Sequence, residues 1–275
     1  MAINNFIPTV WSETLLNNLD REYIGVKNCS REFEGDIQKK GDIVKISSIG
    51  AVNVFDYTKN TDMSEPQTLD GTSTQLEITE SKAFNFQIDD IDRAQQTPKI
   101  MNAAMAEAAA ALADQADKYI YSLWDRVNGD NTLTVDGVSA DNLTDVLVTA
   151  RELLYTNNVG GNTELVLEVS PRIASMILKC KISDGSTPDA IENGLLGSFI
   201  GCKIYVSGNI AVDESGFDKC FLRTKRAVAF AEQLKGMEAY RPEKRFADAV
   251  KGLHLYGAKI IRPAELVLLN MKPAE

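Results

Sequence analysis

The chain has 275 residues, of which 44% are hydrophobic and 25% charged, a composition typical of a folded globular protein rather than a disordered one. The 39 acidic and 29 basic residues give a net charge of −10, which argues against nucleic-acid backbone binding as the main task, because proteins with that task concentrate lysine and arginine. No run of about 20 apolar residues predicts a membrane span, and residues 1–8 lack the basic and apolar regions of a signal peptide.

The first predicted element is an amphipathic helix near the N-terminus. Trp11, Leu15, Leu19 and Tyr23 recur at four-residue steps, which places their side chains on one face. Such a stripe packs either on the chain's own core or on a neighbouring subunit. The pattern alone leaves both alternatives open.

Residues 35–88 are predicted to form strands around a long polar tip. The segments 43–46 and 52–55 read as strands, and apolar side chains return after residue 76. The stretch 58–73 is polar and offers few anchors for a core. Because a pair of strands cannot cover both of its faces alone, we expect this region to project from the body and to be steadied by another copy of the chain.

The strongest local signal is a helix from Pro98 to Arg126. Thr97 is a suitable N-cap, Pro98 fits the first helical position, and apolar residues follow at steps of three or four. Nine of the residues 103–116 are alanine, which favours helix and allows another element to approach closely. At ~1.5 Å per residue the helix would be ~43 Å long, so we expect a structural spine.

The remainder of the chain is predicted to mix strands and helices. Residues 132–138 read as a hairpin that turns at Asp136-Gly137, and amphipathic helices are expected over 143–154 and 171–180. Further strands are expected at 165–167, 203–206, 220–222, 227–231, 237–240, 253–256, 259–261 and 266–269. Without repeats or a clean linker, this mixture predicts the α+β class with intertwined subdomains.

Catalytic chemistry finds little support in the sequence. His254 is the only histidine and lies in a strand-like segment, so every site that needs two histidines is excluded. The four cysteines form no Cys-x-x-Cys pair and are expected to be reduced, buried thiols. We therefore expect no enzyme activity, no cofactor and no metal site. The alternative is a soluble enzyme that uses His254 or the acidic surface.

Several segments are similar to tailed-phage major capsid proteins. Residues 194–207, GLLGSFIGCKIYVS, resemble the family signature Gly-x-x-Gly-x-x-x-Gly-aromatic-x-Val-x-x-Ser, with Cys202 at the usual aromatic position. The segments 227–234, 238–243 and 256–263 are similar to the same family. The resemblance covers nearly the whole chain and is to the Hong Kong 97-like capsid fold, especially its compact podovirus-coat-like branch.

The resemblance implies an α+β chain whose parts follow the order of that fold. The implied parts are an N-terminal arm (1–35), an extended β-hairpin loop (36–92), a peripheral domain with the long spine helix (93–129 and 226–257) and an axial domain (130–225 and 258–275).

The resemblance also implies a structural function. The chain would assemble with copies of itself into hexamers and pentamers of an icosahedral shell, the virion capsid, which forms in the bacterial host cytoplasm. Its partners would be a separate scaffolding protein, a portal and packaged double-stranded DNA held only non-specifically, with no membrane. The alternative on the same fold is an encapsulin-like protein nanocompartment. Contacts between subunits are expected at Trp11, Leu15, Leu19, Lys59, Asn60 and Asp62.

Overall fold

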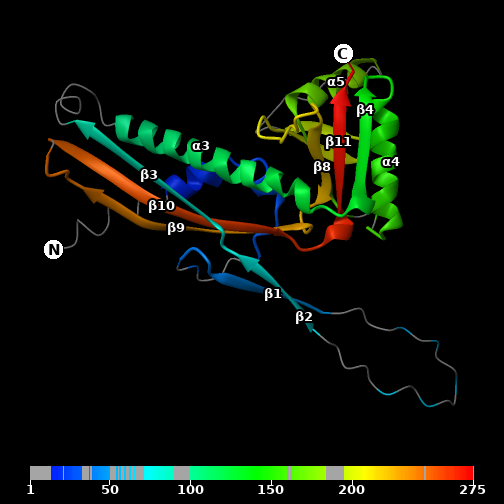
Figure 1. Cartoon of the computed structure of the whole chain (residues 1–275), viewed down its shortest axis with the longest axis horizontal. Coiled ribbons are helices and arrows are strands. Elements are labelled where there is room, and N and C mark those ends of the chain that lie inside the picture. The colour runs from blue at the N-terminus through cyan, green and yellow to red at the C-terminus, as the bar shows by residue number, and fades with distance from the viewer. Residues whose placement is uncertain are drawn as a thin grey trace.

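A long helix organises the chain, with one sheet along its length, a second sheet near its C-terminal end and a hairpin that extends away from both (Figure 1). The structure is a computed structural model, and its mixture of helices and strands confirms the expected α+β class. It describes residues 14–20, 22–32, 37, 39–49, 54, 56, 59, 62, 65, 71–89, 99–159, 161, 163–183, 195–244 and 246–274.

Helix α3 (Lys99–Tyr121) confirms the predicted spine. Its 23 residues are followed directly by a 3-10 turn, η2 (Ser122–Arg126), which reaches the predicted end. The predicted N-cap and first helical position, residues 97–98, lie outside the described residues. The buried positions recur every three or four residues and form one stripe: Met105, Ala109, Leu112, Ala113, Ala116 and Ile120.

The sheet along α3 is antiparallel, with the strand order β3-β10-β9. Its strands are β3 (Glu80–Asp89), β9 (Val228–Tyr240) and β10 (Ala247–Ile260). The runs predicted separately at 227–231 and 237–240 fall almost entirely in the single strand β9. Residues 232–235 between them keep their pairing with β10, and a bulge follows at 236–237. We call this sheet the peripheral sheet.

Strand β3 falls within 36–92, the range expected for the extended loop, but it belongs to the peripheral sheet. All ten of its residues pair with β10. The projecting part is therefore shorter than expected. It consists of β1 (Ile43–Ile49), β2 (Gly71–Glu77) and their connection, which we call the extended hairpin.

The second sheet, which we call the axial sheet, is mixed and has the order β4-β11-β8-β5-β7-β6. The pairs β4–β11 and β5–β7 are parallel, and the other three are antiparallel. Its strands are β4 (Thr132–Val138), β5 (Leu165–Val169), β6 (Leu195–Phe199), β7 (Cys202–Val206), β8 (Asp218–Thr224) and β11 (Leu266–Pro273).

Two predicted helices pack their apolar faces into the same core as this sheet. They are α4 (Leu143–Thr156) and α5 (Pro171–Ser183). The predicted cap of α5 is confirmed, since the backbone N–H of Ile173 donates to Ser170 Oγ at 3.3 Å. Of the helices in the described part of the chain, none is long and apolar enough to cross a membrane.

The prediction of a hairpin at 132–138 is wrong. The whole segment is one strand, β4, parallel to β11, which lies more than 120 residues later in the sequence. Gly137 does adopt a positive φ of 72°, but it produces only a register shift near the strand end and no reversal of the chain. A local turn pattern could not reveal that β4 pairs with a distant strand.

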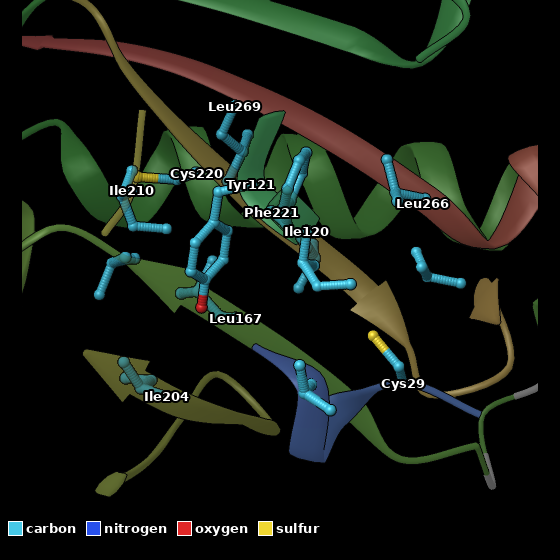
Figure 2. Close-up of a cluster of buried hydrophobic side chains, with 14 of the residues drawn as sticks. Cys29, Ile120, Tyr121, Leu167, Ile204, Ile210, Cys220, Phe221, Leu266 and Leu269 are labelled. Carbon is cyan, nitrogen blue, oxygen red and sulfur yellow. The ribbon is translucent and has the colours of Figure 1, made fainter. Parts of the chain in front are cut away.

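One apolar core is shared by the helix and the axial sheet. Figure 2 shows Tyr121, at the end of α3, beside Phe221 of β8, and their rings stack with centroids 6.1 Å apart. Leu167, Ile204 and Leu269, from three further strands, surround the same space. The bodies on either side of the helix end are thus joined by continuous packing rather than by a free linker.

A second, smaller core lies at the base of the extended hairpin. Its members come from the hairpin and its flanks and from the peripheral sheet: Ile37, Ile46, Leu76, Ile78, Ala229, Ala231 and Leu255. All are buried, whereas Ser73 and Gln75, farther along β2, are exposed.

Candidate assembly interface

The N-terminal helix packs on its own subunit. Leu15 and Leu19 are fully buried and belong, with Tyr23, to the main core. Both side chains therefore pack within their own subunit, and the expected contact with a neighbouring subunit stays a prediction. Leu16, at the edge of this face of the helix, is 37% exposed. Trp11 lies outside the described residues, and its contact stays a prediction.

The chain that follows this helix, residues 22–32, passes between the helix α3 and both sheets, and we call it the crossing segment. Its first anchor is Asp117 of α3. The Asp117 carboxylate accepts the backbone N–H groups of Ile24 at 2.9 Å and Val26 at 3.0 Å. Burial raises the pKa of Asp117 to about 6, against the opposing effect of these hydrogen bonds.

The second anchor is a buried ion pair on the axial sheet. Arg223 of β8 and Glu168 of β5 are both fully buried, and two bonds of 2.8 and 2.9 Å join the guanidinium to the carboxylate. Arg223 also donates to the carbonyl oxygens of Asn28 at 2.6 Å and Gly25 at 3.0 Å. The guanidinium therefore neutralises a buried acid and holds the crossing segment at the same time.

The third anchor is on the peripheral sheet and contains the only histidine. Glu232 of β9 accepts from Tyr23 Oη and lies 2.8 Å from His254 Nε2, while its other oxygen accepts from Arg31 at 2.7 Å. Burial acts to raise the pKa of Glu232, but the hydrogen bonds and charges of His254, Tyr23 and Arg31 outweigh it, so the pKa is lowered. His254 is fully buried and serves as a structural partner with no access for a substrate.

Backbone pairing completes this attachment. Ser30 donates its N–H to the Val228 carbonyl at 2.8 Å and accepts the Phe230 N–H at 2.9 Å, so the crossing segment adds to the edge of β9. None of the three anchors is predicted by the sequence. The sequence feature that could indicate the ion pair is a charged residue next to apolar residues in a predicted strand, as in Leu167-Glu168-Val169 or Leu222-Arg223.

The extended hairpin is the region with the least support from its own subunit. Within the part of the chain that the structure describes, its two strands pair only with each other, from Ile43↔Glu77 to Ile49↔Gly71. Figure 1 shows them leading away from the rest of the molecule. Lys59 and Asp62, in the connection, are exposed. Asn60 and most of the strand predicted at 52–55 lie outside the described residues. The contacts expected at these positions stay predictions.

Exposed apolar side chains mark further candidate contact surfaces. Phe246, between β9 and β10, is 82% exposed, and Tyr240 beside it is partly so. On α4, Val148 and Tyr155 are exposed seven residues apart and share one face of the helix. Large exposed side chains of this kind favour contact with another protein surface.

The glycine-rich signature forms a tight turn rather than a ligand loop. Phe199 of β6 pairs with Cys202 of β7, and the two residues between them, Ile200 and Gly201, both have positive φ. That geometry suits a two-residue hairpin turn, in which glycine is favoured. Cys202 is buried in β7. Within the described ranges, no group of three or more His, Cys, Asp or Glu side chains could hold a metal ion.

Solved structures with this architecture include phage capsids and an encapsulin complex. A structure from Mycobacterium phage Che8 is 27% identical, covers 90% of this chain and 91% of its own, and has a TM-score of 0.65. The capsid of Cyanophage P-SCSP1u is 15% identical over 89% of this chain and 86% of its own, also with a TM-score of 0.65. The holo-SrpI encapsulin complex from Synechococcus elongatus PCC 7942 is more distant, with 8% identity, coverage of 85% and 83%, and a TM-score of 0.54.

The long helix, the two sheets and the projecting hairpin thus constitute the Hong Kong 97-like fold. The family model described as phage capsid protein matches residues 72–269, and the chain belongs to this family. The expected bacteriophage capsid function is confirmed at this level. A search of curated proteins found no match.

Proposed function

We propose that this capsid protein forms hexamers and pentamers that close into an icosahedral shell around double-stranded DNA. The observation that carries the proposal is the extended hairpin, a two-stranded ribbon whose strands pair with no other strand among the described residues. Because an isolated two-stranded ribbon is marginally stable in water, its apolar and polar groups need partners. Neighbouring copies in a closed ring supply them repeatedly, with the same contact at every subunit.

The parts of the subunit would take different roles in the shell. In our proposal the axial domain, 130–225 and 258–275, forms the ring contacts of hexamers and pentamers. The peripheral domain, 93–129 and 226–257 with β3 added, forms the wall between rings. The extended hairpin lies across a neighbour, and the arm 1–35 contributes through its first residues.

The remaining partners follow from the same proposal. A separate scaffolding protein would guide closure in the bacterial host cytoplasm, and a portal would admit the DNA. The net charge of −10 suits a container that holds DNA non-specifically and releases it, because a strongly basic wall would retain the phosphates.

Electron microscopy of the purified full-length protein, with and without a co-expressed scaffolding protein, tests the proposal. We expect rings or closed shells far larger than one subunit. A protein that stays monomeric at every concentration and salt, with the scaffold present, would contradict it. The content of the particles separates the phage shell from the encapsulin-like alternative: DNA and a portal support the first, and a cargo enzyme supports the second.

A further inference from the structure

A glycine in β10 lies where the extended hairpin leaves the peripheral sheet. Gly257 is buried and pairs with Ala231 of β9 on one side. On the other side, β3 begins one residue earlier, with Tyr256 opposite Glu80. The end of β2 at Glu77 and the two residues that connect it to β3, 78–79, therefore pass Gly257 at the point where strand pairing stops.

The backbones approach so closely here that no side chain fits. A Cβ atom on Gly257 would lie 2.3 Å from the carbonyl oxygen of Glu77 and 3.1 Å from Ile78 Cα. Ordinary contact begins near 3.4 Å, so Glu77 would have to move by about 1 Å. The atoms in the way belong to the backbone and cannot rotate aside. At Gly252, by contrast, an added Cβ would meet only the side chains of Met237 and Phe84.

Hydrogen bonds also fix the turn that connects β2 to β3. The Ile78 N–H donates to the Asp42 carbonyl at 2.9 Å, and the Gly41 N–H donates to the Ile78 carbonyl at 2.8 Å. Thr79 Oγ1 is 2.7 Å from the hydroxyl of Tyr119 on α3. These bonds hold both strands of the hairpin to one short piece of backbone, and that piece rests on Gly257.

We propose that Gly257 is a positioning residue that sets the direction in which the extended hairpin leaves the peripheral sheet. The inference rests on the proposed function, since direction matters only if the hairpin reaches a neighbouring subunit. A shift of the turn by about 1 Å occurs at the base of the hairpin, so it reorients all the residues beyond it. Replacing Gly257 by alanine would then leave a folded subunit whose hairpin points away from its partner.

Distance measurements by electron paramagnetic resonance test this on the full-length subunit before assembly. Spin labels on Ser73→Cys in β2 and Val148→Cys in α4 report the direction of the hairpin, because both positions are exposed and the four native cysteines are buried. We expect Gly257→Ala to shift the mean distance. Gly208→Ala is the matched control, since an added Cβ there meets nothing within 4 Å, and it should leave the distance unchanged.

The assembled state gives the second readout. Gly257→Ala should yield no shells or malformed ones in electron micrographs, whereas Gly208→Ala should assemble as the wild type does. Identical distances and identical shells for the two alanine variants would overturn the inference. If the wild type itself forms no shells, the proposed function fails, while a shift in the subunit's label distance still supports the positioning role.

A second variant guards against loss of folding in Gly257→Ala. Tyr119→Phe removes the hydroxyl that meets Thr79 and adds no atom, so the turn should loosen without being displaced. We expect a broader distance distribution with the same mean. An unchanged width of the distance distribution would contradict the proposed positioning of the hairpin at this point. A Gly257→Ala subunit that fails to unfold cooperatively, while Gly208→Ala unfolds normally, would contradict it as well.

Discussion

The crossing segment and the extended hairpin are both extended pieces of chain, but the subunit treats them in opposite ways. The crossing segment, residues 22–32, is bonded to Asp117, to Arg223 and to Glu232, three buried charged groups on three different elements. The hairpin pairs with itself and is held at its base by a few apolar residues and backbone bonds. The first is held from several sides within one subunit, whereas the second, in the proposed shell, is completed by a neighbouring copy.

Because of this contrast, changes in the two regions should affect different properties, the stability of the subunit and the assembly of the shell. Changes at the anchors of the crossing segment should destabilise the isolated subunit. Changes at the outer part of the hairpin should leave the subunit's stability nearly unchanged and act on the shell. The predictions below run from the largest expected change in free energy of unfolding to the smallest.

Replacing Arg223 should cost the most. Arg223→Ala leaves Glu168 as a buried charge without a partner and frees two buried carbonyls, and losing one member of such a pair typically costs about 3–5 kcal/mol. Chemical denaturation measures the loss. Arg226→Ala, which removes an exposed arginine paired with Glu265, is the control and should cost less than about 1 kcal/mol. Equal losses would mean that the buried anchor is unimportant.

Truncation on the N-terminal helix should distinguish its buried position from its partly exposed one. Leu15→Ala opens a cavity in the main core and should destabilise the subunit by about 2–5 kcal/mol. Leu16→Ala, one residue along and partly exposed, should change the free energy of unfolding far less. If thermal unfolding finds the two variants alike, the helix does not pack on its own subunit.

Asp117 should make the stability of the subunit depend on pH. Its pKa is raised from an ordinary 3.8 to about 6, so between these values the folded state binds more protons than the unfolded state. Stability from this group is therefore present at low pH and falls by about 2 kcal/mol as pH rises from about 4.5 to 7. Denaturation curves for Asp117→Asn should lack this fall. Parallel curves for the wild type and the variant would contradict the assignment.

The smallest change in stability is expected in the connection of the hairpin. Lys59→Ala and Asp62→Ala remove exposed side chains, so each should alter the free energy of unfolding by less than about 0.5 kcal/mol. The yield of closed shells should nevertheless fall. Glu214→Ala, an exposed acid of the axial domain, is the control for surface charge. Normal shell yields from both hairpin variants would remove these residues from the interface.

The features that the sequence predicted correctly are the local ones. Helix α3 follows from its alanine content and periodicity, and the cap of α5 follows from Ser170 and Pro171, because these signals lie within a few residues of one another. The capsid family was evident from the resemblance of the segments around residues 194–207 and 256–263, and the family match confirms it.

The features that it missed depend on distant partners. β4 was mistaken for a hairpin because its partner β11 comes at the end of the chain. The periodicity of Leu15 and Leu19 is compatible both with packing on the chain's own core and with packing on a neighbouring subunit. Only the folded structure shows that both side chains lie in the main core. Glu168 and Arg223 are 55 residues apart, and only the folded sheet brings the two charges together.

Hydrogen exchange of the extended hairpin, measured on the free subunit and on the closed shell, tests the central claim most directly. If adjacent copies complete the hairpin, backbone amides in the outer part of β1 and β2 should exchange at least about tenfold more slowly in the shell, while the crossing segment is equally protected in both states. Equal protection of the hairpin in the subunit and in the shell would show that it needs no partner and would contradict the account.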